Sequence, residues 1–104
     1  MSSALSEEVH ATMKKPAFSQ TWNTVVSLAG KTFVTKTGLP FIYQVKGQLV
    51  YPSRTNYQIA RSDFQVAYKF VPLPGPGAVN RIIRGPAYVW AILHDKRVSH
   101  GGIW

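Results

Sequence analysis

The spacing of apolar residues predicts two helices that each carry an apolar stripe along one side. Over residues 19–29 apolar side chains recur every three or four positions, and Ser19 can cap the start while Gly30 can end the helix. The same spacing returns over 62–71, where Asp63 lies at a position at which negative charge stabilises a helix N-terminus. Both helices are therefore expected to bury one face.

A third helix is predicted over 86–95, because Pro86 suits a first helical position and the residues after it are apolar nearly all round. A helix without a polar side is expected to be the central buried element. The run Pro72–Gly77 contains three prolines and is interpreted as a loop connecting two helices, although such a loop can also serve as a flap. Residues 78–84 fit either a short strand or a helical turn.

Strands are predicted between the first two helices, where β-branched and aromatic residues are frequent and turn signals separate the runs. The runs are 32–37, 41–45 and 48–51, with a further short piece at 57–59. Lys46 and Gly47 predict a tight hairpin. Phe41, Tyr43 and Val45 share one face of their strand, because side chains alternate along it. One face of the sheet is expected to pack on helices, and the other face is expected to be partly exposed to solvent.

Together these elements predict an α+β fold. A small antiparallel sheet of three or four strands packs against about three helices, in the order α-β-β-β-(β)-α-α. Residues 16–104 are expected to form a single domain, because a chain of 104 residues with 45% hydrophobic content can build one core. Residues 1–15 are expected to be a flexible N-terminal tail, since they lack an apolar stripe and hold two of the four acids.

The longest apolar run is far shorter than the roughly 20 residues that a membrane-spanning helix needs. The chain also lacks cysteine, which fits a reducing compartment. We therefore expect a cytoplasmic protein with neither a signal peptide nor a membrane partner.

Charge points to the class of partner. From Met13 to Trp104, twelve Lys and Arg residues accompany only two carboxylates, Asp63 and Asp95, so this part of the chain has a formal charge of +10. Such a surface attracts polyanions, and DNA or RNA is the expected partner. An acidic protein partner, or charge that serves solubility alone, are the alternatives.

The same composition excludes several kinds of chemistry. Two isolated acids from Met13 onward leave almost nothing for carboxylate catalysis or hard-metal binding, and this part of the chain has no paired carboxylates. The chain also has no phosphate-binding loop and no familiar zinc-ligand spacing. We therefore expect no metal and no cofactor, and we assign no catalytic residue.

Two stretches supply candidate contacts to nucleic acid. The segment from Ser53 to Ser62 combines arginine, amide and hydroxyl groups that contact phosphates and base edges, just before a helix N-terminus. Lysines around the predicted hairpin lie close in sequence to Tyr43 and Tyr51, a combination that suits single-stranded bases. The candidate nucleic-acid-binding residues, whose cations are expected to contact phosphates, are Lys31, Lys36, Lys46, Arg54, Asn56, Tyr57, Arg61, Arg81 and Arg84.

Ordinary structural roles explain the same residues. Ser, Thr and Asn cap turns, while arginines beside them are often simply solvated. Lysines protect sheet edges from aggregation, and aromatic residues are more often part of a core. Arg81 and Arg84 are three residues apart, which also places them on the exposed side of a helical turn.

The alternative functions depend on the C-terminal third of the chain. His94, Lys96, Arg97 and His100 offer general acid–base and phosphate-holding groups, so a metal-independent, toxin-like ribonuclease is one alternative. The same residue types also stabilise the last turn of a helix. Another alternative is a protein-interaction or homodimerisation module that uses an exposed Trp104 and the Pro72–Gly77 loop.

The predicted order of helix, three strands and helix over residues 18–71 is similar to the topology of double-stranded RNA-binding domains. That resemblance implies contacts to an RNA duplex by shape and phosphates. The lysine cluster that those domains carry at the start of their last helix is represented here only by Arg61.

Overall fold

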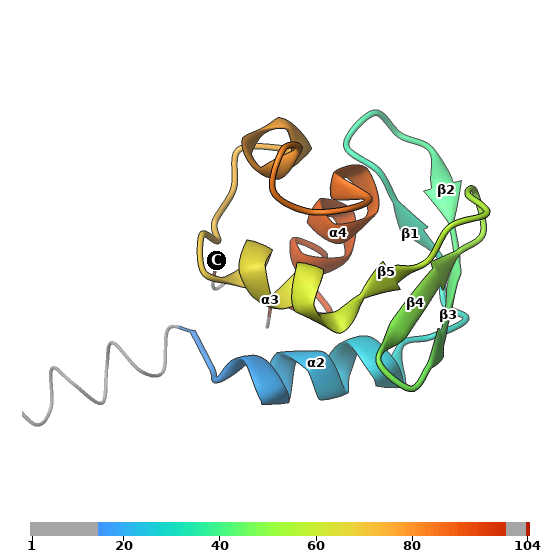
Figure 1. Ribbon diagram of the computed structural model, residues 1–104, viewed down its shortest axis with the longest axis horizontal. Coiled ribbons are helices and arrows are strands. Elements are labelled where there is room, and N and C mark those ends of the chain that lie inside the picture. The colour runs from blue at the N-terminus through green and yellow to red at the C-terminus, as the bar shows by residue number, and fades with distance from the viewer. Residues whose placement is uncertain (1–14, 100–103) are drawn as a thin grey trace, which may run out of the picture.

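The structure is a computed structural model that describes residues 15–99 and 104. Apart from Lys15, the predicted N-terminal tail lies outside the described residues. The elements in chain order are α2 (Phe18–Ser27), β1 (Phe33–Val34), β2 (Pro40–Phe41), β3 (Tyr43–Lys46), β4 (Leu49–Pro52), β5 (Ile59–Ala60), α3 (Arg61–Tyr68), the 3-10 helix η1 (Pro76–Val79) and α4 (Pro86–Leu93). The predicted α+β fold with antiparallel strands is confirmed (Figure 1).

The strands form two small sheets, β1–β2 and β3–β4–β5, where the sequence predicted one. The division falls at Ile42, between β2 and β3. The Ile42 N–H donates to the hydroxyl of Ser53 (3.1 Å) rather than to a backbone carbonyl, so regular pairing is interrupted there. The double-stranded RNA-binding topology is therefore not reproduced in detail, because five short strands in two sheets stand between α2 and α3.

The inner faces of both sheets build the core, as the alternation of side chains predicted. Phe41 and Tyr43 are buried and Val45 is partly buried, while Gln44 and Lys46 between and after them are exposed. The helices lie to one side of the strands in Figure 1. The hydroxyl of Tyr43 on this inner face donates a buried hydrogen bond to the carbonyl of Val25 in α2.

Helix α4 is the central buried element, as predicted. Val89, Ala91, Ile92 and Leu93 are all buried, and in Figure 1 the helix stands between the strands and α3. Its apolar circumference allows it to contact α3, η1 and β1 at once. No helix in the described part of the chain is long and apolar enough to cross a lipid bilayer.

Some helix ends differ from the predictions. Helix α2 begins at Phe18, and the backbone carbonyl of Ala17 accepts the N–H groups of Gln20 and Thr21, so Ser19 does not cap it. Helix α3 begins at Arg61 and ends at Tyr68, before the cis peptide bond between Val71 and Pro72. The ambiguous segment 78–84 contains no strand, and it continues η1 through turns.

Candidate nucleic-acid interface

Asp63 fastens the start of α3 to the segment that precedes α4. Its Oδ2 accepts the backbone N–H of Ala60 (3.3 Å), and its Oδ1 accepts the backbone N–H of Arg84 (3.3 Å). The next residue, Gly85, has a φ of 61°, and a Cβ there would lie 2.4 Å from Cδ1 of Ile59. Only glycine therefore lets the chain run this close to β5 in this conformation.

The side chains of Arg61, two residues before Asp63, and of Arg84, whose backbone N–H Asp63 accepts, rest on aromatic rings. The guanidinium carbon of Arg61 lies 4.9 Å from the centroid of the Phe18 ring and 5.8 Å from that of Trp22. The guanidinium carbon of Arg84 lies 5.3 Å from the centroid of Tyr57. Planar guanidinium groups stack on such rings while their N–H donors point outward from the edge.

The donors of these two arginines are not used within the described chain. Neither guanidinium donates a hydrogen bond to a described residue, and the ion pair between described residues is the one between Arg97 and Asp95. Both carboxylate oxygens of Asp63 accept hydrogen bonds from backbone N–H groups instead. We call Tyr57, Arg61, Asp63 and Arg84 the α3-start surface. Its two cations are oriented by rings but not neutralised by a carboxylate.

Other predicted residues adjoin this surface. Asn56 is exposed and precedes Tyr57 directly. The backbone N–H of Arg61 donates to the carbonyl of Gln48 (2.8 Å), which places the β3–β4 hairpin and Lys46 beside the start of α3. Arg54 lies at the far end of β4, where its Nε donates to the carbonyl of Pro40 (2.7 Å).

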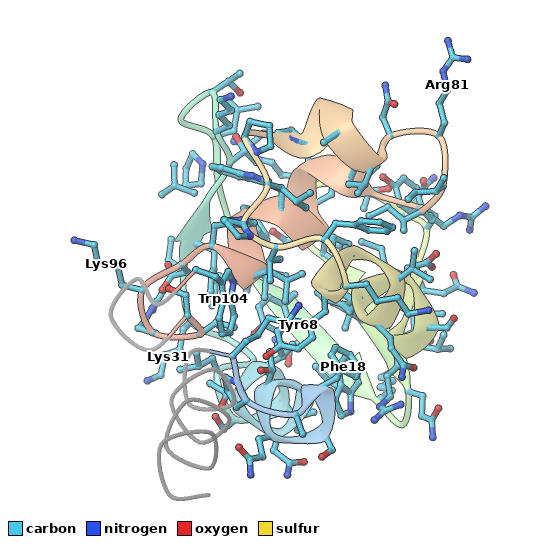
Figure 2. All side chains as sticks on the ribbon, turned by 90° about the vertical axis from the view of Figure 1, so that its left-hand side faces the viewer. Phe18, Lys31, Tyr68, Arg81, Lys96 and Trp104 are labelled. Carbon is cyan, nitrogen blue, oxygen red and sulfur yellow. The ribbon has the colours of Figure 1, made fainter. Side chains whose placement is uncertain are left out.

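Three predicted residues lie elsewhere. Lys36 donates from Nζ to the carbonyl of Pro74 (2.8 Å), so it holds the proline-rich loop. Figure 2 shows Arg81 projecting on one side of the molecule and Lys31, together with Lys96, on the opposite side. The nine predicted contacts therefore do not form one face.

The C-terminal residues of the ribonuclease alternative are occupied by structural contacts. The Nε2 atom of His94 accepts the backbone N–H of Leu73 (2.9 Å), and Nδ1 lies 3.1 Å from the carbonyl of Trp90. The imidazole also stacks on the Trp90 ring at 5.0 Å, and Trp90 Nε1 donates to the carbonyl of Leu73 (2.9 Å). Burial lowers the pKa of His94, which favours the neutral ring that accepts the Leu73 N–H.

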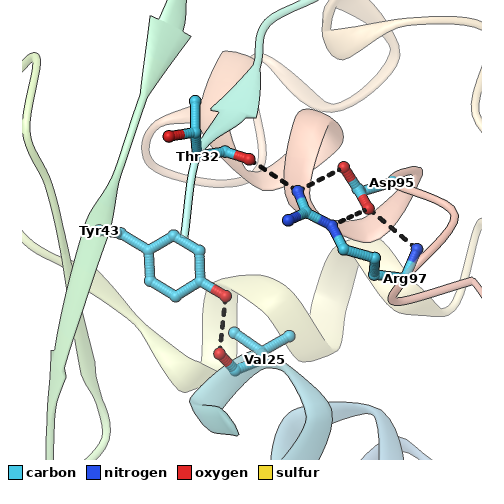
Figure 3. A network of polar contacts seen from close by, with 5 residues as sticks. All are labelled: Val25, Thr32, Tyr43, Asp95 and Arg97. Atoms are coloured by element: carbon cyan, nitrogen blue, oxygen red, sulfur yellow. Dashed lines mark hydrogen bonds and ion pairs between the residues drawn. The ribbon is translucent and has the colours of Figure 1, made fainter. Parts of the chain in front are cut away.

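Arg97 and Asp95 bind each other, as Figure 3 shows. Nε of Arg97 donates to Asp95 Oδ1 (2.8 Å), one terminal nitrogen donates to Oδ2 (2.9 Å), and the same nitrogen donates to the carbonyl of Thr32 (2.7 Å). The Arg97 side chain holds the pKa of Asp95 below its ordinary value. Figure 3 also shows Tyr43 donating to the carbonyl of Val25 (2.6 Å), and burial raises the pKa of that phenol.

Of the two remaining members of the C-terminal group, the structure describes Lys96 alone. Lys96 is exposed. His100 lies outside the described residues. The structure therefore gives His94 and Arg97 roles in holding the chain together.

Both parts of the protein-interaction alternative differ from the prediction, Trp104 in its exposure and the loop in its extent. Trp104 is half-buried rather than exposed: its Nε1 donates to the carbonyl of Leu93 (2.9 Å), and its ring meets that of Tyr68 edge-on at 5.2 Å. The Pro72–Gly77 segment is a loop only up to Gly75, since η1 begins at Pro76.

Sequence reasoning did not anticipate how many cations rest on aromatic rings. Besides Arg61 and Arg84, the cations of Lys15, Lys36, Lys46 and Arg97 each lie over a ring of the described chain. A signal for this was present in the composition, because 12% aromatic residues accompany very few carboxylates. Apart from Tyr51, which follows Lys46 closely in sequence, the ring partner of each cation could not be read from the composition, since it is distant in sequence.

The described residues contain no group of three or more His, Asp or Glu side chains able to hold a metal ion. Comparisons with protein families, with curated proteins and with solved structures gave no match for the chain.

Proposed function

We propose that this protein binds DNA or RNA through phosphate contacts centred on the α3-start surface. The observation that carries the proposal is the state of Arg61 and Arg84: both are oriented by rings, and neither donates to a described residue. Arginines held in this way lose little side-chain entropy when they bind a phosphate. Asn56 and Lys46 extend the contacts, and Arg54 adds a more distant one.

A charge-matched pair of double variants tests the proposal. Arg61→Ala with Arg84→Ala removes two cations from the α3-start surface, while Lys31→Ala with Lys96→Ala removes two exposed cations from another part of the body. Affinity for labelled single-stranded DNA, duplex DNA and duplex RNA is measured by fluorescence anisotropy over a series of salt concentrations.

We expect the α3-start variant to lose about tenfold in affinity at low salt. The slope of log affinity against log salt should fall in magnitude by about 1.4 on single strands or about 1.8 on duplex, the value for two lost phosphate contacts. The control variant should lose much less. Equal losses in both variants would show that net charge acts without a site, and no binding by the wild type would overturn the proposal.

A further inference from the structure

The three-stranded sheet has one open face. Its register pairs Gln44 with Tyr51 and Lys46 with Leu49, and paired residues lie on the same side of a sheet. These four side chains are exposed or half-buried, whereas Val50 on the opposite side is fully buried. The described helices stand on the buried side of the strands (Figure 1).

Apolar side chains extend this open face across the two-stranded sheet. Val34 is 52% exposed and pairs with Pro40, and Ile42 is 37% exposed and lies two residues after Pro40, hence on the same side. Leu39, at 48%, belongs to the same hairpin. Half of the six exposed large apolar side chains in the described body are therefore gathered here, which is not the scattered pattern of an ordinary surface.

Cations accompany the apolar residues on this face. The ammonium nitrogen of Lys46 lies 5.7 Å from the centroid of the Tyr51 ring. Arg54 is tied to the carbonyl of Pro40 through Nε, so its terminal nitrogens remain without a described partner. The two described side-chain carboxylates, Asp63 and Asp95, belong to α3 and to the segment after α4. The open face thus combines a ring, aliphatic groups and positive charge without a carboxylate on its strands.

From this combination we infer that the open face, formed by Ile42, Gln44, Lys46, Tyr51 and Arg54, binds the bases and phosphates of a single-stranded nucleic acid. The inference rests on the proposed function and specifies its substrate. A single strand presents both aromatic faces and negative charge, which match the Tyr51 ring, the Lys46 ammonium beside it and the Arg54 guanidinium beyond the end of β4. A duplex hides the faces of its bases in the stack, and a second copy of this chain would bring the same positive charge.

The strands of the open face adjoin the start of α3 through the backbone. The turn between β3 and β4 carries Gln48, whose carbonyl accepts the N–H of Arg61. Leu49 pairs with Lys46 on one side and with Ala60, the residue before Arg61, on the other, so the strand register brings the backbone of Lys46 near the start of α3.

The test separates base contacts from phosphate contacts by the choice of ligand. The full chain is titrated with a short labelled oligothymidylate, with an abasic oligonucleotide of the same length, and with the duplex of the same oligothymidylate. We expect the wild type to bind oligothymidylate about tenfold more tightly than the abasic strand, as one stacked base implies. Tyr51→Ala should remove that difference, and Tyr51→Phe should keep it within about twofold, because the ring remains.

A matched pair of apolar variants checks that the effect belongs to this face. Ile42→Ala should weaken binding of oligothymidylate about threefold through lost contact with bases. Val26→Ala removes a side chain of similar exposure, 40%, from helix α2 and should leave affinity unchanged. Thermal unfolding of each variant verifies that it is folded before affinities are compared.

The outcomes distinguish this inference from the proposed function. Equal wild-type affinity for oligothymidylate and the abasic strand, or tighter binding of the duplex, would overturn the inference and leave phosphate binding by the α3-start surface in place. Tighter binding to vesicles of anionic phospholipid than to any oligonucleotide would also overturn it. Failure of the wild type to bind any of the nucleic acids would overturn both.

Discussion

The two carboxylates of the described body, Asp63 and Asp95, produce opposite results with the arginines beside them. Asp95 accepts hydrogen bonds from the guanidinium of Arg97, and that guanidinium also donates to a backbone carbonyl. Asp63 accepts two backbone N–H groups, so the guanidiniums of Arg61 and Arg84 remain without a carboxylate partner. The comparison shows that the number of charged residues does not tell which cations are available to contact a partner. The bonds that each acid makes decide where a polyanion can be held.

The largest expected effect comes from breaking the C-terminal cluster. His94→Ala leaves the buried N–H of Leu73 without its acceptor and removes the stacking on Trp90, so the free energy of unfolding should fall by about 2 kcal/mol. Affinity for nucleic acid should not change. Urea unfolding measures the first quantity, and Lys96→Ala serves as a neighbouring control that should stay within about 0.5 kcal/mol. A loss of affinity in a folded His94→Ala protein would contradict the structural role.

The second effect concerns Asp63. Asp63→Ala removes the acceptor of two backbone N–H groups and should lower the free energy of unfolding by about 1 kcal/mol. Asp63→Asn makes the same change of charge but keeps one acceptor oxygen, so it should be the more stable of the two.

The affinity for nucleic acid gives a second prediction for Asp63. Removal of a negative charge from the α3-start surface should raise the affinity of the Asp63→Asn protein for single-stranded DNA about threefold at low salt, and less at high salt. Anisotropy titrations check this. If Asp63→Asn weakened binding, the arginines of the α3-start surface would not be the phosphate contacts.

A smaller effect is expected from Arg97→Ala. The ion pair with Asp95 is partly exposed, and such pairs contribute about 0–1 kcal/mol, so the free energy of unfolding should fall by about 0.5–1 kcal/mol. Affinity should change no more than for removal of Lys96, which carries the same charge one position earlier. A much larger loss of affinity for Arg97→Ala than for Lys96→Ala would place Arg97 in the interface.

The smallest effect is on the dependence of stability on pH. Because burial lowers the folded pKa of His94, the unfolded chain binds more protons in the window between that pKa and the ordinary value of 6.5. The contribution of the neutral ring is full above 6.5 and is lost as pH falls through the window. Asp95, whose pKa is also lowered, adds a second loss at more acidic pH, as pH falls below its ordinary value of 3.8.

Urea unfolding of the wild type at pH values from about 8 down to about 4 measures the first of these losses. The first loss should be absent in His94→Gln, which has no titrating ring, and present in Lys96→Ala. A wild-type stability that stayed constant as pH fell below 6.5 would contradict the role assigned to His94.

Local patterns predicted the elements of this fold well, because their causes are local. The three helices follow from apolar spacing, and the hairpin at Gly47 follows from a residue that adopts a φ of 61° easily. The position of α4 at the centre follows from its apolar circumference. The division into two sheets did not follow, because it depends on the hydroxyl of Ser53, eleven residues away from Ile42.

The candidate site was predicted only in part, for the same reason. The composition of the segment from Ser53 to Ser62 was enough to predict Arg61 and Tyr57 as contacts. Their proximity to Arg84 depends on the hydrogen bond that the Arg84 N–H donates to Asp63, 21 residues away in sequence. Tyr43 and Tyr51 were grouped by proximity in sequence, yet Tyr43 is buried while Tyr51 belongs to the open face. The register of the hairpin, which no single strand reveals, separates them.

Arg97 has one more consequence, for the behaviour of the protein at high concentration. Strand β1 pairs only with β2 among the described strands, so its other edge could serve as a template for a strand of another molecule. The carbonyl of Thr32, immediately before β1, is occupied by the Arg97 guanidinium, which also lies 4.2 Å from the centroid of the Phe33 ring. The charged Arg97 side chain thus occupies a backbone acceptor at the start of this edge, and we expect it to oppose the growth of intermolecular β-sheet.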